Sequence, residues 1–350
     1  MNCWSFVCLN LLFLITNMNS LVMHHKQKLI RWGIIGCGNV TEKKSGPAFY
    51  QLPDSALEAV MRRDELKAHH YAIRHNVPKY YTKATDLIED AAVDAVYVAT
   101  PPDSHARYAL EALAAGKPVY VEKPMALNHR QCMEMIEASE KYDVPLYVAY
   151  YRRALPYFLK IKDLIDSDTI GKVLYAYMRL EREITESDHH PGQIWRLNPS
   201  ISGGGYFVDL GSHQINMLQF LFGPVASHKS FVRNKAGIYE VEDFVNVVLQ
   251  HQSGIDVSCT WSFCAPAGRR VDEVEVVGEK GSLYFSVFDM NSIRVVANHR
   301  VDSFEVAVEP VIQKPMISRI NEAIRHGIDM KQDLLEAAST TLLMQKILQE

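Results

Sequence analysis

Two segments that lie far apart in the sequence carry side chains able to act on one small molecule. Lys123 stands in a Glu-Lys-Pro sequence at 122–124, directly after the apolar run 119–121. Asp209 and His213 are four residues apart, and this spacing would place both on one face of a helix. A lysine ammonium can donate a hydrogen bond to an oxygen that gains negative charge, and it can also exchange a proton. Lys123, Asp209 and His213 are therefore the candidate catalytic residues.

A glycine-rich turn upstream of Lys123 has the pattern of a dinucleotide phosphate site. It follows an apolar, strand-like run and comes before a helix-like segment, the context that gives such a pattern meaning. Gly36 permits a tight turn, Gly38 lets the backbone approach a pyrophosphate, and the helix amino terminus favours negative charge. Thr41 replaces the third glycine, which predicts slightly wider packing of helix and strand. The predicted cofactor contacts in the turn are Gly36, Cys37, Gly38, Asn39 and Val40.

The residues after the second expected strand bear on the choice between NAD and NADP. Enzymes that prefer NAD commonly carry an acidic residue there, which binds the ribose 2′-hydroxyl. This chain instead has Arg62 and Arg63, whose guanidinium groups suit a 2′-phosphate. We therefore expect NADP, with NAD possible, although a solvated arginine pair at a helix start would look the same. Asp64 could be the helix N-cap instead of a ribose ligand.

Two patterns of apolar residues divide the chain. Between 29 and 150, strand-length apolar runs alternate with amphipathic helices, which indicates βαβ units and a parallel sheet. The expected strands are 30–35, 57–61, 79–81, 95–99, 118–121 and 146–149, and the clearest helices are 104–115, ended by Gly116, and 128–141. Beyond 150, the period-2 runs 244–249, 255–261, 274–276 and 282–285 indicate an antiparallel sheet with one face packed, and 333–348 is a final helix.

Composition excludes some partners. The chain has 350 residues, 48% of them hydrophobic and 22% charged, and a formal net charge of -4 without a long run of like charge. Such a chain has no field to attract nucleic acid or an anionic membrane, so neither is an expected partner. Adjacent histidines such as His69 and His70 point apart on a regular element, and we therefore expect no metal.

The cysteines and the first residues bear on the compartment. Six cysteines without C-x-x-C spacing indicate reduced thiols and a cytoplasmic protein. Residues 3–22 are apolar enough for a signal peptide, but no Lys or Arg comes before them. We interpret 1–28 as a leader that is disordered or follows a mis-assigned start, and the alternative is an export signal.

Three motifs together indicate a family. The glycine turn, the Glu-Lys-Pro sequence and the glycine-rich 201–213 segment, in this order, resemble the Gfo/Idh/MocA family of glucose-fructose oxidoreductase, inositol dehydrogenase and rhizopine catabolism proteins. The resemblance implies an α/β protein: a Rossmann doubly wound parallel sheet at 29–150, an α+β substrate-binding and oligomerisation domain with an open, mostly antiparallel sheet at 151–332, and a helix at 333–350 that packs back on the first domain. It also implies a homodimer or homotetramer.

The resemblance places further residues. The loop formed by Thr100, Pro101, Pro102 and His105 should run along the cofactor, with Glu122 and Lys123 near its reacting end. The family's reacting lysine falls on Lys123, and its helix-borne acid and histidine fall on Asp209 and His213. Position after the last expected strand of the first domain, or polar chemistry, adds Tyr150, Arg152, Trp195 and Arg196. The full set of expected substrate contacts is Lys123, Tyr150, Arg152, Trp195, Arg196, Asp209 and His213.

These residues indicate hydride transfer between a nicotinamide and a sugar, polyol or related diol, because hydroxyl-rich substrates need several convergent polar groups. The sequence leaves open whether Lys123 or His213 carries the proton. Two alternatives keep the fold: an NAD-dependent glycosidase, and a nucleotide-sensing regulator without turnover.

Overall fold

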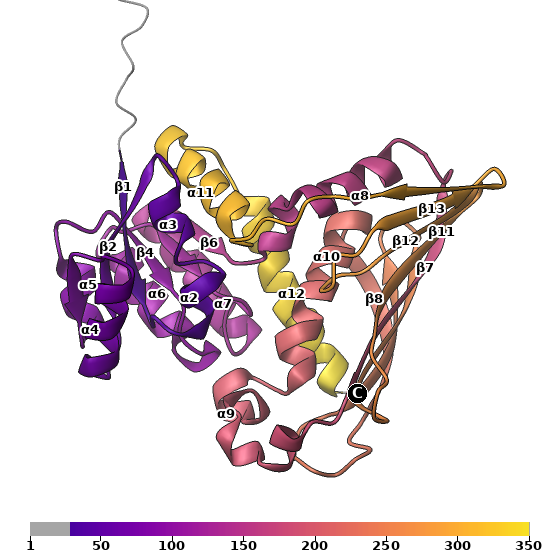
Figure 1. Ribbon diagram of the computed structural model, residues 1–350, viewed down its shortest axis with the longest axis horizontal. Helices are drawn as coiled ribbons and strands as arrows, with labels where there is room; N and C mark the ends of the chain where they lie inside the picture. The colour runs from indigo at the N-terminus through magenta and orange to yellow at the C-terminus, as the bar shows by residue number, and fades with distance from the viewer. Residues whose placement is uncertain (1–28, 350) are drawn as a thin grey trace, which may run out of the picture.

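The computed structural model describes residues 29–349, so the expected leader at 1–28 lies outside the described residues. Figure 1 shows an α/β unit built by the first half of the chain and a large sheet built by the second half. Helices α10 (Ser212–Phe222) and α12 (Lys331–Gln349) stand between them. None of the described helices is long and apolar enough to cross a membrane.

The first sheet is parallel and has the strand order β3-β2-β1-β4-β5-β6. Its strands are β1 (Ile30–Ile35), β2 (Ser55–Met61), β3 (Lys79–Tyr81), β4 (Ala95–Val98), β5 (Val119–Val121) and β6 (Leu146–Val148). Every expected strand is present, with small differences at the ends. The order reverses between β1 and β4, and ligands of open α/β sheets bind at such a switch point, beyond the carboxyl ends of the strands. The doubly wound Rossmann prediction is confirmed.

The helices of this unit are α2 (Asn39–Lys43), α3 (Ala48–Gln51), α4 (Glu65–Arg74), α5 (Ala84–Glu89), α6 (His105–Ala114) and α7 (His129–Tyr142). The expected 104–115 helix is α6, preceded by a 3-10 turn (Pro102–Ser104), and Gly116 follows with φ +73°. The helix after the glycine turn is short. The chain bends after it at Gly46, where a Cβ would lie only 2.1 Å from the Thr41 carbonyl oxygen.

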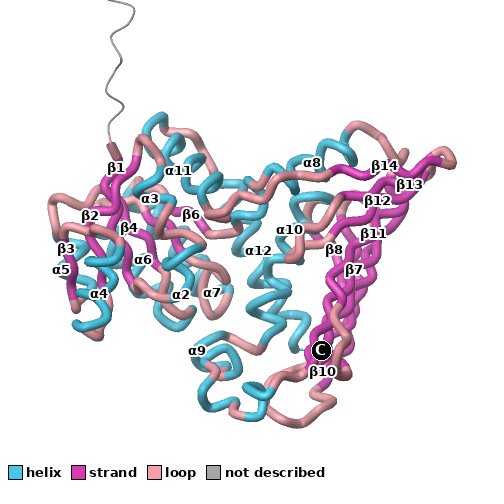
Figure 2. Tube along the Cα trace, in the orientation of Figure 1, coloured by secondary structure: helices cyan, strands magenta, loops and turns pink. Residues whose placement is uncertain are grey.

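The second sheet has the order β14-β13-β12-β11-β7-β10-β9-β8 and is antiparallel except between β7 and β10. Its strands are β7 (Val173–Glu183), β8 (Val225–Arg233), β9 (Phe244–His251), β10 (Asp256–Ala265), β11 (Val271–Gly278), β12 (Gly281–Phe285), β13 (Ile293–Ala297) and β14 (Arg300–Phe304). The four expected strands are β9 to β12. Helix α8 (Pro156–Asp166) and helix α10 lie on one side of this sheet, and the other side is open (Figure 2).

Helix α11 (Lys314–His326), which the sequence patterns did not predict, packs on the first unit. Its fully buried Asn321 accepts a hydrogen bond from Trp32 Nε1 at 3.1 Å and donates to Asp54 Oδ1 at 3.2 Å. Helix α12 contacts both units, because Gln345 accepts from the His129 amide of α7 and Thr340 accepts from Asn216 of α10. The chain after β14 therefore returns to the first unit.

Replacement of Asn321 by leucine should lower the free energy of unfolding by about 2 to 4 kcal/mol, because it leaves the buried Trp32 N–H and one Asp54 oxygen without this partner. Glu322→Leu is the matched control, since Glu322 is the exposed neighbour on the same helix and should change stability by less than about 0.5 kcal/mol. Urea unfolding measures both. Equal stability of the two variants would show that Asn321 does not anchor α11.

Candidate active site

A cleft of about 700 Å³ opens at the carboxyl edge of the parallel sheet. Its volume suits a small-molecule site. Most of the predicted cofactor residues line it: Gly36, Cys37, Gly38, Asn39, Val40, Arg62, Arg63, Thr100, Pro101, Pro102, Glu122 and Lys123. Trp195, Arg196 and Asp209 of the second unit line the same cleft. The structure therefore brings the expected cofactor segments and part of the expected substrate side together.

The glycine turn fits a ligand with a phosphate. Gly36 has φ +91°, and a Cβ there would lie 2.6 Å from Thr100 Cγ2, so the chain itself requires glycine. At Gly38, the nearest chain atom to an added Cβ would be 3.7 Å away, so packing within the chain does not explain that glycine. Close approach of a pyrophosphate does explain it. The residues present therefore fit a dinucleotide.

Thr41 modifies this turn. It is fully buried, and its Oγ1 accepts from the Gly38 amide at 3.0 Å and donates to the Gly38 carbonyl at 2.9 Å. The Gly38 N–H is thus occupied within the chain. The helix that follows the turn, α2, ends at Lys43 and is therefore short.

The residues after β2 have separate roles. Arg62 donates through Nη1 to the Cys37 carbonyl at 3.1 Å and so joins the glycine turn. Arg63 is exposed, and it forms no hydrogen bond or ion pair with the residues that the structure describes. Asp64 caps α4, with Oδ1 accepting from the Lys67 amide at 3.1 Å, which confirms the N-cap alternative.

His105 lies beneath the cleft surface and does not line it. Its Nδ1 is 3.0 Å from the Pro124 carbonyl oxygen and its Nε2 is 2.7 Å from that of Thr100. Burial lowers the pKa of His105, while these two carbonyl groups oppose that shift. The structure therefore places His105 between the loops that follow β4 and β5, where it joins them, and not on the surface that a cofactor would touch.

Asp209 joins Lys123 to Arg196 across the cleft. Lys123 Nζ donates to Asp209 Oδ1 at 2.6 Å and to the Asp209 carbonyl at 2.7 Å, and Arg196 Nε donates to Asp209 Oδ2 at 2.6 Å. Burial alone would raise the pKa of Asp209, but the charges and hydrogen bonds of Lys123 and Arg196 outweigh it and lower that pKa to about 2. We call Lys123, Asp209 and Arg196 the ion triad.

Glu122, the residue before Lys123, holds the backbone at Lys123 in place. It is buried, and its carboxylate accepts from the Tyr97 hydroxyl at 2.6 Å, from Gln313 Nε2 at 2.7 Å and from the Lys123 amide at 3.1 Å. Gln313 immediately precedes α11 and also accepts from the Tyr120 hydroxyl at 2.9 Å. These contacts fix the backbone that carries Lys123.

His213 is placed differently from the prediction. Asp209 lies in a π-helical turn (Phe207–Gly211) and His213 in α10, so one regular α-helix does not carry both. The His213 ring is buried, the aromatic rings of Tyr150 and Tyr151 contact it edge-on, and its Nδ1 has no hydrogen-bond partner among the described residues. Burial, together with nearby cationic side chains, lowers the pKa of His213 well below its usual value, so the imidazole is neutral.

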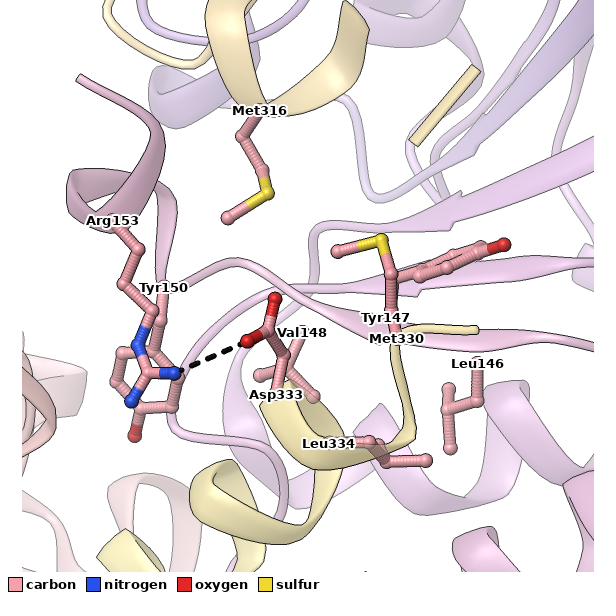
Figure 3. Close-up of a pocket in the computed structure, with 9 residues that line it drawn as sticks. All are labelled: Leu146, Tyr147, Val148, Tyr150, Arg153, Met316, Met330, Asp333 and Leu334. Atoms are coloured by element: carbon pink, nitrogen blue, oxygen red, sulfur yellow. Dashed lines mark hydrogen bonds and ion pairs between the residues drawn. The ribbon is translucent and has the colours of Figure 1, made fainter. Parts of the chain in front are cut away.

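Three expected substrate contacts, Tyr150, Arg152 and His213, do not line the cleft. Arg152 is buried and donates to the Val287 carbonyl at 3.0 Å, so its guanidinium holds the second unit together. The neighbouring Arg153 reaches Asp333 of α12 at 3.3 Å beside a cavity of about 10 Å³ (Figure 3), which is room for a water molecule only.

Lys44 and Tyr108 also line the cleft, and the motifs did not indicate them. Lys44 directly follows α2, and its carbonyl accepts from the Gln313 amide at 3.0 Å. Within the described residues, no group of three or more His, Cys, Asp or Glu side chains could hold a metal ion.

Comparisons with known proteins agree with this geometry. The model of an oxidoreductase family with an NAD-binding Rossmann fold matches residues 30–150, and that of the GFO/IDH/MocA C-terminal domain matches 158–284. "Oxidoreductase P35" of Formosa agariphila is 42% identical over 293 residues, which are 83% of this chain and 89% of that protein. The trans-1,2-dihydrobenzene-1,2-diol dehydrogenase of Mus musculus is 29% identical over 254 residues, 72% of this chain and 73% of that protein.

A solved structure shows the same fold. The aldose-aldose oxidoreductase from Caulobacter crescentus, complexed with glycerol, superposes with a TM-score of 0.82 at 24% identity, covering 91% of this chain and 96% of that one. The fold, the two matching family models and the Formosa relative agree with one another. The chain therefore belongs to the GFO/IDH/MocA family of NAD(P)-binding oxidoreductases.

Proposed function

We propose that this enzyme is an NADP-dependent dehydrogenase or reductase that moves a hydride between the nicotinamide and a CH–OH or carbonyl carbon of a sugar, polyol or diol. The observation that carries the proposal is the position of Lys123. Its ammonium is held in the cleft by Asp209, at the wall where residues of the two units meet. When bound, the nicotinamide supplies or accepts the hydride, and the chain supplies the proton and the orientation.

Lys123 is the proposed proton carrier. An ammonium has three N–H donors, and two of those on Lys123 are used by Asp209. The third forms no hydrogen bond with a described residue and can donate to the substrate oxygen. In reduction this donor stabilises the negative charge that develops on oxygen and then transfers its proton, and in oxidation the neutral amine accepts the proton.

His213 is the weaker candidate for this role. Its lowered pKa keeps the ring neutral, and a ring that resists protonation is a poor carrier of the proton. A neutral imidazole still has one N–H donor and one acceptor nitrogen. The ring does not line the cleft, however, so we propose that Lys123, which does, exchanges the proton.

The substrate class rests on the cleft wall and on the relatives. Trp195 offers an apolar ring and Arg196 lies over it, with its Cζ 4.5 Å from the ring centroid, so a flat apolar face and polar donors stand side by side. The similar mouse protein is named for a dihydrodiol, and the similar Caulobacter protein for aldoses. These features support a hydroxylated small molecule.

We propose a homodimer or homotetramer that forms through the open face of the second sheet. Tyr175 and Tyr177 of β7, Phe231 of β8 and Val248 of β9 are large exposed side chains on this sheet. Exposed apolar side chains that gather on one face commonly mark an interaction site.

We also propose a cytoplasmic location, because the four cysteines that the structure describes are free thiols.

A screen of aldoses, polyols and diols with NAD and NADP, read by nicotinamide absorbance, tests the proposed function. Net oxidation or reduction of one class supports it. Cleavage of a glycoside without net change in absorbance would indicate the glycosidase alternative. Cofactor binding with no turnover of any compound would indicate a regulator.

Lys123→Met should lower the rate of hydride transfer about 100-fold to 1,000-fold, because it removes one preorganised donor and keeps an apolar stem of similar length. Cofactor affinity should change little. Lys172→Met, at an exposed lysine that does not line the cleft, is the matched control and should retain the wild-type rate. Stopped-flow absorbance measures the rate, with folding checked by thermal unfolding. A wild-type rate in Lys123→Met would contradict the assignment.

Arg63→Ala should weaken NADP binding about tenfold or more and leave NAD binding nearly unchanged, because the lost contact is a charge-assisted bond to the 2′-phosphate alone. Arg62→Ala should weaken both cofactors, because Arg62 also holds the Cys37 carbonyl of the turn. The control is Arg130→Ala at an exposed position of α7, where Arg130 pairs with Glu134. Fluorescence titration gives the affinities, and equal losses of NAD and NADP in Arg63→Ala would rule out a phosphate contact.

The ion triad should make stability depend on pH. The folded pKa of Asp209, about 2, lies below its usual 3.8, so its ionised form stabilises the fold above pH 3.8 and this contribution is lost as the pH falls toward 2. Asp209→Asn should therefore be less stable than the wild type at pH 7, and the gap should narrow as the pH falls below 4. Urea unfolding at several pH values measures it, and a gap that does not vary with pH would contradict the shift.

A further inference from the structure

The cleft lining holds a cation, Lys44, that the proposed reaction with a neutral substrate does not use. Lys123, Arg196 and Lys44 all line the cleft, and apart from Asp64, which caps α4, its lining carboxylates are Asp209 and Glu122. Both carboxylates already accept hydrogen bonds inside the protein: Asp209 from the ion triad, and Glu122 from Tyr97, Gln313 and the Lys123 amide. Neither carboxylate is therefore paired with the Lys44 ammonium.

Lys44 is held at the cleft wall by its backbone. Its carbonyl accepts from the amide of fully buried Gln313 at 3.0 Å, and the same glutamine side chain bonds Glu122 next to Lys123. The Lys44 ammonium forms no hydrogen bond or ion pair with the described residues. Its charge also contributes to lowering the pKa of the His213 ring, which burial lowers most. The bond to Gln313, whose side chain holds Glu122 next to Lys123, places Lys44 on the same side of the cleft as Lys123.

Arg196 is also only partly used. Its Nε donates to Asp209, whereas its two Nη atoms form no hydrogen bond or ion pair with a described residue. The side chain is 43% exposed and lies over Trp195. A guanidinium that is fixed through Nε keeps its terminal N–H groups in a planar fork, which matches the oxygens of a carboxylate.

We propose that the substrate is a sugar acid, a uronate or an aldonate, whose carboxylate binds Lys44 and the Nη atoms of Arg196 while Lys123 acts on a hydroxyl or carbonyl of the same molecule. The inference rests on the proposed function and narrows its substrate class. A carboxylate of the substrate would give the Lys44 ammonium the anionic partner that no described residue supplies. With a neutral sugar, only the cofactor phosphates could take that place.

The test compares acids with neutral sugars of the same skeleton: glucuronate with glucose, galacturonate with galactose, and gluconate with glucitol. Binding to the enzyme saturated with NADP is followed by intrinsic tryptophan fluorescence, to which Trp195 of the cleft contributes. At least one acid should bind about tenfold or more tightly than its neutral partner, because a charge-assisted bond is gained. The preference should shrink at high salt, since exposed charges are screened.

Lys44→Gln should reduce this acid preference about tenfold, with a smaller change for the neutral partner. Lys43→Gln is the matched control: it removes the same charge from the adjacent exposed lysine, which does not line the cleft, and it should keep the wild-type preference. Arg196→Lys keeps the charge but loses the fork, and it should also weaken binding of the acid more than that of its neutral partner. Thermal unfolding confirms that the variants are folded.

Three outcomes would overturn the inference: no acid bound in preference to its neutral partner, the same loss of preference in Lys43→Gln, or a loss of NADP affinity in Lys44→Gln in place of a loss of acid binding. The last result would assign Lys44 to the cofactor phosphates. Measurement of nicotinamide turnover shows whether the sugar-acid inference alone fails or the proposed function fails as well. Oxidation of neutral sugars without acid preference would reject the sugar acid alone, whereas the absence of nicotinamide turnover with every sugar, polyol and diol would reject the proposed function.

Discussion

The ion triad of Lys123, Asp209 and Arg196 is the interaction on which the arrangement of the cleft depends. Asp209 is largely buried, and a buried carboxylate without partners would be costly or would bind a proton. It remains ionised because each of its oxygens accepts from a cation. Lys123 follows β5 of the first unit, whereas Asp209 and Arg196 come from the second. The same contacts that stabilise the buried Asp209 carboxylate therefore also join the two units at the proposed reaction site.

This arrangement restricts the lysine. Because two of its three donors are committed to Asp209, the direction of the remaining N–H is set by the second unit as much as by the strand that carries Lys123. Gln313 adds a constraint from the other side. It joins Glu122, Tyr120 and the Lys44 backbone through one buried side chain and its amide. A change in the packing of α11 would therefore shift the backbone at Lys44 and Lys123, although α11 itself does not line the cleft.

The sequence was sufficient for features that depend on local patterns. The strands of the parallel sheet, the N-cap of α4 at Asp64 and the Lys123 position follow from apolar runs, capping chemistry and motif order. Strand β7 was missed because apolar residues occupy consecutive positions at its start, which hides the period of two. The position of His213 was missed for a different reason. A spacing of four implies a shared face only in a regular α-helix, and the π-helical turn before α10 changes that relation.

Arg152 and Lys44 show more clearly what sequence patterns do not predict, because the positions of both side chains depend on contacts between distant segments. Arg152 was expected to contact the substrate because it follows β6. Its Nε instead donates a hydrogen bond to the carbonyl of Val287, 135 residues later in the chain. No motif singled out Lys44, and its place at the cleft depends on Gln313, whose amide bonds the Lys44 carbonyl. Net charge is equally uninformative here, since a formal charge of -4 describes the whole chain and not one cleft. Composition can argue against extended anionic partners such as nucleic acid, which need a long basic surface. It does not exclude a small anion, which needs only two or three cations that the fold gathers from separate segments.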